Sequence, residues 1–211
     1  QPENQIYKIL KADILIECFE DEKAQQLLCN LKFKKDSLLH FQSEILISKI
    51  FINQKNYKLA EEILLELRKI FSKQKILYLN LSDLYFKSKE LEKGISILKE
   101  GIVNFPKFIP LRFNLAIMYR NLGLIELSIK THIEILLVDK FNSNSFYELS
   151  TMYDFASHDQ LLKTLLNCEI ENLSPKEKVY LGYSKANIYH QNNEYKKSSY
   201  FLKIANEEKL K

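Results

Sequence analysis

Glycine, proline and cysteine are scarce in this sequence, and each scarcity excludes a class of structure. Four Gly and four Pro among 211 residues leave too little turn chemistry for many strands or hairpins. Leucine, isoleucine, lysine and glutamate dominate instead, which favours helices. The three cysteines, Cys18, Cys29 and Cys168, include no CxxC pair, so we expect reduced thiols in the core and neither a disulfide nor a metal site. The composition therefore predicts an all-α fold.

Long apolar runs and blocks of like charge are also absent. No apolar run approaches the roughly 18 residues of a membrane span, and the first four residues do not form a signal peptide. The 31 basic and 27 acidic residues give a net charge of +4 and are spread along the chain, whereas phosphate binding needs clustered Lys and Arg. We therefore expect a cytoplasmic protein that binds neither membrane nor nucleic acid. Because the chain starts with Gln1 and not with Met, we also expect a processed chain or a piece cut out of a longer protein.

Catalytic constellations are missing as well. The four histidines stand at unrelated spacings and form no metal-ligand pattern. No Ser or Cys stands beside a base and an orienting group, and the glycines are too dispersed for a phosphate loop. His132 falls in a helix-packing position, so we expect a satisfied structural histidine, and we expect His158 and Asp159 in a solvated loop. The sequence predicts no enzyme activity, no metal and no cofactor.

A period of about 34 residues runs through the chain and is most legible in Lys75 to Asn142, two blocks of equal length. Four columns of matching residues extend it both ways, at intervals of 36, 34, 34, 34 and 36. In the first helix of each block a small residue is followed three positions later by a large one. In the second helix a small residue is followed four positions later by a bulky one. The columns are Ala12, Ser48, Ser82, Ala116, Ser150, Ala186; Leu15, Phe51, Tyr85, Tyr119, Tyr153, Tyr189; Ala24, Ala60, Gly94, Ser128, Leu162, Ser198; and Leu28, Leu64, Leu98, His132, Leu166, Leu202.

This pattern resembles the tetratricopeptide repeat (TPR) family, a 34-residue helix–turn–helix unit in which small residues let two helices approach and bulky ones fill the gap to the next unit. The clearest copy is Ile109 to Asn142, where Ala116, Tyr119 and Gly123 match the family's small, aromatic and turn positions. The resemblance implies an all-α, right-handed α–α superhelix, a TPR solenoid of antiparallel helix pairs forming one domain over residues 1–211. Its repeats would span 5–38 as a degenerate cap, 41–74, 75–108, 109–142, 143–176 as a degenerate copy, and 177–211.

Two departures from the pattern predict local differences. Leu162 stands in a small-residue position, so we expect the second helix of that block to be shifted or shortened. Ser174, Pro175 and Glu177 make a capping box with Pro at the first helical position. We therefore expect the first helix of the last block to begin near Pro175 and to run long, and the second to span roughly Tyr195 to Leu210.

The resemblance also implies a binding surface, because the concave face of the family is lined by first-helix positions between the packing residues. We expect a protein or peptide to bind there; the alternative is that several of the aromatic rings pack against adjacent repeats or an unseen domain. In this register the groove residues are Ile45, Lys49, Leu79, Asp83, Phe86, Phe113, Ile117, Arg120, Tyr147, Thr151, Asp154, Tyr183 and Asn187, with Ile52, Asn53, Lys87, Asn121, Phe155, His190 and Gln191 beside them.

Chaperone-binding members of the family hold a C-terminal carboxylate with a set of Lys, Asn and Arg side chains. Here the first pair of positions holds Ile45 and Lys49, and the third helix offers Pro110 and Asn114 in place of Lys and Arg. Only Asn80 fits its place. The sequence therefore predicts no binding of this carboxylate-clamp type.

Two other functions remain as alternatives. Residues 173 to 211 resemble the last repeat before the catalytic domain of bacterial TPR-sulfotransferase proteins, through the Leu-Ser-Pro-x-Glu start, the turn at Asn193-Glu194-Tyr195, Ser198, and Ala205-Asn206 followed by basic residues. This resemblance implies a non-catalytic arm that precedes a catalytic domain in a longer bacterial protein. Helical repeats can also read RNA bases, but the 34-residue spacing and the unpatterned groove charges argue against that role.

Overall fold

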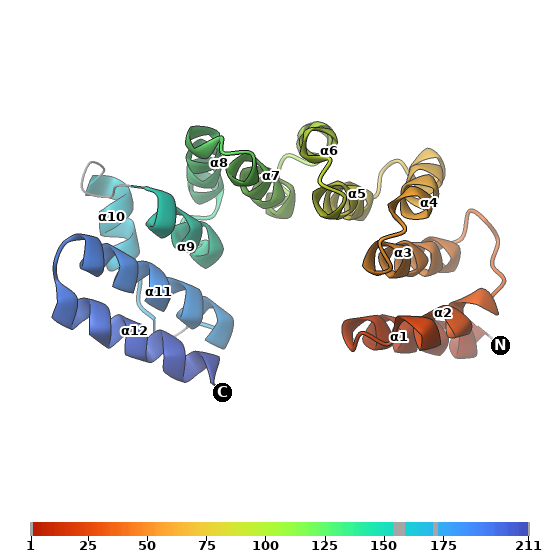
Figure 1. Cartoon of the computed structure of the whole chain (residues 1–211), viewed down its shortest axis with the longest axis horizontal. Helices are drawn as coiled ribbons and strands as arrows, with labels where there is room; N and C mark the ends of the chain where they lie inside the picture. Colours follow the sequence, from red (N-terminus) through yellow and green to blue (C-terminus); the bar gives the residue numbers. More distant parts are fainter. Residues whose placement is uncertain (1, 154–158, 171–172, 211) are drawn as a thin grey trace. The chain divides into compact units, whose positions relative to one another are not determined.

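The computed structural model describes residues 2–153, 159–170 and 173–210, and every regular element in these ranges is an α-helix. The helices form consecutive pairs in which an odd-numbered helix packs on the even-numbered helix after it, except for α9 and α10 (Figure 1). The prediction of an all-α fold is confirmed. The helices are α1 (Pro2–Glu17), α2 (Asp21–Cys29), α3 (Leu38–Asn53), α4 (Tyr57–Ile70), α5 (Lys75–Lys87), α6 (Leu91–Asn104), α7 (Ile109–Asn121), α8 (Ile125–Val138), α9 (Ser143–Met152), α10 (Asp159–Leu166), α11 (Pro175–Gln191) and α12 (Tyr195–Lys209).

The chain divides into two compact units, Gln1–Pro106 with α1 to α6 and Lys107–Lys211 with α7 to α12. Unit 1 contains two apolar clusters, one shared by α1, α2 and α3 and the other centred on α3, α4 and α5. The described residues of unit 2 contain one apolar cluster, formed mainly by α9, α10 and α11. The expectation of a single solenoid domain stays a prediction.

The small-residue column of the first helices is buried in every repeat, from Ala12 to Ala186. Three of its members are serines, and each hydroxyl donates to the carbonyl three residues earlier in its own helix, as Ser48 Oγ does to Ile45 O at 2.7 Å. In the second helices, Ser128 Oγ donates to Ala116 O at 2.9 Å and Ser198 Oγ to Ala186 O at 2.8 Å. A polar atom is therefore satisfied wherever serine replaces alanine at these close helix contacts.

Each described hairpin turn places one residue in the left-handed region of backbone space. These residues are Phe19, Lys55, Lys89, Gly123 and Asn193, with φ between 60° and 76°. The N–H of the next residue donates to the carbonyl five residues back at 2.8–2.9 Å, which satisfies an otherwise orphaned helix-end carbonyl. The sequence predicts Gly123 and the turn at Asn193, because Gly and Asn adopt this conformation readily, whereas Phe19, Lys55 and Lys89 carry no comparable turn signal.

The expected departures are present. Helix α10 has 8 residues, whereas α4, α6 and α8 have 14 each. Helix α11 begins at Pro175, has 17 residues and carries the complete capping box, and α12 ends at Lys209. Of the expected solvated loop, His158 lies outside the described residues, and Asp159 begins α10. The expectation of core thiols is wrong for two of three cysteines, because Cys18 and Cys29 are exposed and only Cys168 is buried.

Candidate protein-binding groove

In unit 1, the first helices of three successive pairs line an open pocket of about 290 Å³. Figure 1 shows α3 between α1 and α5, with α4 and α6 beyond α3 and α5. The wall of this pocket is mainly apolar, and three of its side chains are exposed, those of Ile6, Leu10 and Ile76. The lining residues are Ile6, Ile9, Leu10, Asp13, Phe41, Gln42, Ile45, Leu46, Lys49 and Ile76.

A second, polar pocket of about 270 Å³ adjoins the first, because Lys49 lines both. It lies toward the ends of the same three helices, and its lining residues are Ile16, Glu17, Phe19, Lys49, Asn53, Asn80, Asp83 and Lys87. Lys49 Nζ lies 3.5 Å from Asp13 Oδ1, and Lys87 Nζ lies 3.1 Å from Asp83 Oδ2. These pairs are partly exposed, so each contributes little to stability and can be opened by a ligand at small cost. The two pockets together are called the unit 1 groove below.

The unit 1 groove gathers several of the predicted residues, namely Ile45, Lys49, Asn53, Asp83 and Lys87. Ile45 and Ile52 are buried in the apolar cluster of α3, α4 and α5, and Ile45 also lines the apolar pocket. The physical reason is that the apolar residues of α3 are not confined to one face, so residues on its groove side also pack against neighbouring helices. Leu79 is half-buried and Phe86 exposed, and neither lines the two pockets.

In unit 2, the predicted rings are largely engaged with neighbouring side chains. The Phe113 ring packs edge-on against His132 with centroids 5.5 Å apart. The ring centroid of Tyr147 lies 5.5 Å from that of Tyr180 and 6.3 Å from that of Tyr183. The alternative that aromatic groove residues pack against adjacent repeats therefore describes Tyr147 and Tyr183, whereas Phe113 packs within its own repeat.

The polar residues predicted for the same face of unit 2 are also partnered. Arg120 forms an ion pair with Glu148, and Asn187 Nδ2 donates to Ser150 Oγ at 3.0 Å. Tyr183 Oη donates to Asn206 Oδ1 at 2.7 Å. Among the other predicted residues, Ile117 is half-buried, and four are exposed, namely Asn121, Thr151, His190 and Gln191. The Thr151 hydroxyl donates to a carbonyl of its own helix. Asp154 and Phe155 lie outside the described residues.

His132 is fully buried and only half satisfied, which corrects the expectation of a satisfied histidine. Its Nδ1 lies 3.3 Å from Ser145 Oγ, but its Nε2 has no hydrogen-bond partner among the described residues. Burial, with a smaller effect from the Arg120 cation, lowers the pKa of His132 to about 4. The ring is therefore neutral at physiological pH and is unsuited to bind an anion.

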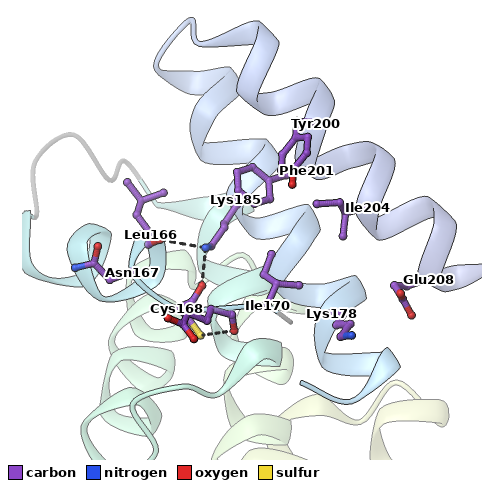
Figure 2. Close-up of a pocket in the computed structure, with 11 residues that line it drawn as sticks. Leu166, Asn167, Cys168, Ile170, Lys178, Lys185, Tyr200, Phe201, Ile204 and Glu208 are labelled. Carbon is purple, nitrogen blue, oxygen red and sulfur yellow. Dashed lines mark hydrogen bonds between the residues drawn. The ribbon is translucent and has the colours of Figure 1, made fainter. Parts of the chain in front are cut away.

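Sequence reasoning missed Lys185, a buried lysine beside a pocket of about 390 Å³ in unit 2. Figure 2 shows its amine between two backbone carbonyls, Leu166 O at 3.1 Å and Cys168 O at 2.6 Å. These carbonyls lie at and just beyond the C-terminal end of α10, where an ammonium group is favoured. A signal was available, because Lys185 aligns with the buried Leu81 and Leu149 of earlier repeats.

The polar groups of this unit 2 pocket stabilise the fold. The lysine amine is committed to the end of the short helix, and burial raises the pKa of the Cys168 thiol, which makes it a poor nucleophile. In the described ranges, no three His, Cys, Asp or Glu side chains gather as metal ligands would. No helix of the described part of the chain is long and apolar enough to cross a membrane.

Solved structures share this fold at low sequence identity, whereas no protein-family model and no curated protein matches the chain. PilF of Pseudomonas aeruginosa is 11% identical with a TM-score of 0.66, over 95% of this chain and 89% of that one. BtubC from P. vanneervenii is 12% identical with a TM-score of 0.62, over 98% and 91%. YrrB, described as a TPR protein with an unusual peptide-binding site, is 13% identical with a TM-score of 0.54, over 88% and 90%. The chain is similar to these proteins in fold, which is that of TPR proteins.

Proposed function

We propose that this chain is a non-catalytic protein-interaction scaffold that binds a peptide or a segment of a partner protein in the unit 1 groove. One observation carries the proposal: two adjoining pockets, one apolar and one polar, run along α1, α3 and α5 and share Lys49. Exposed apolar side chains in a concave surface are the kind of patch that marks an interaction site.

The lining chemistry indicates the kind of ligand. The apolar pocket would receive two or three aliphatic or aromatic side chains against Ile6, Leu10 and Ile76. The polar pocket is lined by the amides of Asn53 and Asn80, whose Nδ2 groups donate to Asp21 Oδ1 and to Ile76 O; the amide oxygens can accept from a peptide N–H or a polar side chain. A segment with an apolar part followed by an uncharged polar part fits this order, either as an amphipathic helix or as an extended strand. We expect no binding of a peptide C-terminal carboxylate, because Asn80 alone matches the clamp set.

The proposal is tested by selecting binding peptides from a displayed random library and measuring their affinities by calorimetry. Ile76→Glu and Lys49→Glu each change one groove side chain that is not fully buried, so the fold should persist. We expect each variant to weaken the selected peptides at least about tenfold, the effect of losing about 1.4 kcal/mol. Val103→Glu, in α6 and outside the groove, is the matched control and should bind as the wild type does. Equal affinity for all four proteins would contradict the proposal.

The sulfotransferase resemblance stays a second proposal, supported only by its helix boundaries. The capping box at Ser174 and the α11 and α12 bounds agree with the motif that carries the resemblance. The same features serve a scaffold equally well, so they do not favour an enzyme arm. Reading the gene beyond the codon for Lys211 decides the matter, because a phosphate-binding loop there would support the arm and its absence would reject it.

A further inference from the structure

The polar pocket of the unit 1 groove lies where three helices end. Glu17, Asn53 and Lys87 are the last residues of α1, α3 and α5, and all three line this pocket. The carbonyl end of a helix carries a partial negative charge, which a nearby cation stabilises. Helix α5 supplies its own cation, Lys87, whereas α1 and α3 have no basic residue in their last turn. Two of the three helix ends therefore do not compensate this charge with residues of their own.

The charged side chains of the polar pocket leave one carboxylate over. Lys49 pairs with Asp13 and Lys87 with Asp83, so each of these amines already has a carboxylate partner. Glu17 is exposed and forms no ion pair with any residue that the structure describes. The uncompensated charge of this pocket is therefore negative, in a chain whose net charge is +4.

An exposed aromatic ring lines the same pocket. Phe19 follows Glu17 by two residues, and its ring is 91% exposed. The same left-handed turn position is exposed in the internal repeats as well, where it holds Lys55, Lys89 and Gly123. The exposure of Phe19 therefore comes from the turn itself, and its aromatic type remains to be explained. An aromatic face and a carboxylate are the two groups that bind an ammonium or guanidinium group.

The groove continues beyond Phe19 into a third pocket of about 380 Å³, which Phe19 also lines. Three acidic residues and one lysine line this third pocket, and that lysine, Lys23, pairs with Glu20. A cation at Phe19 would therefore have an excess of negative charge on both sides of it. The groove presents apolar, polar and then anionic surface in that order.

We propose that the partner segment carries a lysine or arginine side chain after its uncharged polar part, and that Glu17 and Phe19 bind this side chain at the ends of α1 and α3. The inference rests on the proposed function, because it assigns one further ligand residue to the same groove. An acidic side chain in this place would meet the Glu17 carboxylate and two negative helix ends, so the site also discriminates by charge.

The test pairs a change in the protein with a change in the peptide. The probes are the tightest peptide selected from the random library and copies in which each basic residue in turn is norleucine, which keeps an aliphatic chain without the charge. One copy should bind the wild type about three- to tenfold more weakly, the combined effect of an exposed ion pair and a cation–π contact. Glu17→Gln and Phe19→Asn should each weaken the original peptide about two- to fivefold. The double variant should bind that copy and the original equally, since it has lost both groups.

The controls separate recognition from folding and from net charge. Asn adopts the required backbone angle, as Asn193 does in its own turn, so Phe19→Asn should keep the melting temperature. Phe19→Tyr keeps an aromatic face and should bind as the wild type does. Glu62→Gln, at an exposed position of α4 outside all three pockets, removes the same charge as Glu17→Gln and should leave the affinity unchanged.

The outcomes distinguish this inference from the proposed function. If Ile76→Glu loses the peptide while Glu17→Gln and every norleucine copy bind as before, the inference is overturned and the groove stands. Selected peptides that depend on Ile76 but contain no lysine or arginine overturn it in the same way. If Ile76→Glu and Lys49→Glu both bind with wild-type affinity, the groove is rejected and this inference is rejected with it.

Discussion

At the residue scale, two polar side chains stand at positions where several other repeats hold a buried leucine, and they differ in consequence. His132 replaces a buried leucine and leaves one ring nitrogen without a partner among the described residues. Lys185 replaces another, but its amine donates to two carbonyls. An unpaired buried polar atom destabilises a fold, whereas a fully used one can be necessary to it. The same substitution by leucine should therefore have opposite effects at the two sites.

We expect His132→Leu to stabilise unit 2 by about 1 to 2 kcal/mol at pH 7, because it removes an unpaired buried nitrogen. The pKa of His132 is lowered from 6.5 to about 4 in the folded protein. As the pH falls, the unfolded chain therefore binds a proton at His132 before the folded chain does. The free energy of unfolding of the wild type is unaffected by this group above pH 6.5 and decreases between pH 6.5 and 4, by up to about 3 kcal/mol. Urea unfolding at several pH values checks this. A variant that kept the wild-type loss over this window would contradict the assignment.

A second residue-scale prediction concerns the left-handed turn position. Phe19 has φ 60° and its ring is 91% exposed, so its side chain gains little from burial while its backbone is strained. Phe19→Gly should raise the free energy of unfolding by roughly 0.5 to 1 kcal/mol. The matched reverse change is Gly123→Ala, where an added Cβ meets no atom within 4 Å and only the φ of 76° penalises it. It should destabilise by about 1 kcal/mol, and thermal melts that rank the two variants the other way would refute the explanation.

At the element scale, the short helix α10 depends on a residue from another helix. The amine of Lys185 in α11 donates to the carbonyls of Leu166 and Cys168, so Lys185→Leu removes the amine from one part-buried and one buried acceptor. We expect the variant to lose about 1 to 3 kcal/mol of unfolding free energy. Relative to the wild type, amide hydrogen exchange should accelerate more in α10 than in α8. Lys178→Leu, in the same pocket but at its partly exposed edge, is the control. Unchanged exchange in α10 of the Lys185 variant would show that the helix end needs no amine.

The elements also show how far sequence alone could go. Helix boundaries at Pro175 and the shortening of α10 were predictable, because a capping box and a large residue in a small position act within a few residues. The turn positions of Phe19, Lys55 and Lys89 were not, since the neighbouring hydrogen bonds impose the backbone angle. Lys185 was overlooked although its column signalled it, because its partners lie on a helix end whose position depends on tertiary packing.

At the scale of the whole molecule, the repeat predicted the fold but not which part of the groove is open. All six residues of the first small column are buried, because close helix approach requires small residues at a fixed period. Whether a groove ring is exposed depends on lateral partners such as Tyr180 for Tyr147, and these differ between repeats. Ile45 illustrates the limit, since its register position is that of a groove residue but its environment is the core.

The most direct test of the proposed scaffold is a map of where a selected peptide binds. Hydrogen exchange measured by mass spectrometry compares the chain with and without peptide, and Ile76→Glu protein serves as the control. The account predicts slower exchange in α1, α3 and α5 of the wild type, around Lys49 and Ile76, and no change in the variant. Slowing confined to α9 and α11, where Tyr147 and Tyr183 already pack on each other, would contradict the assignment of the unit 1 groove as the binding site.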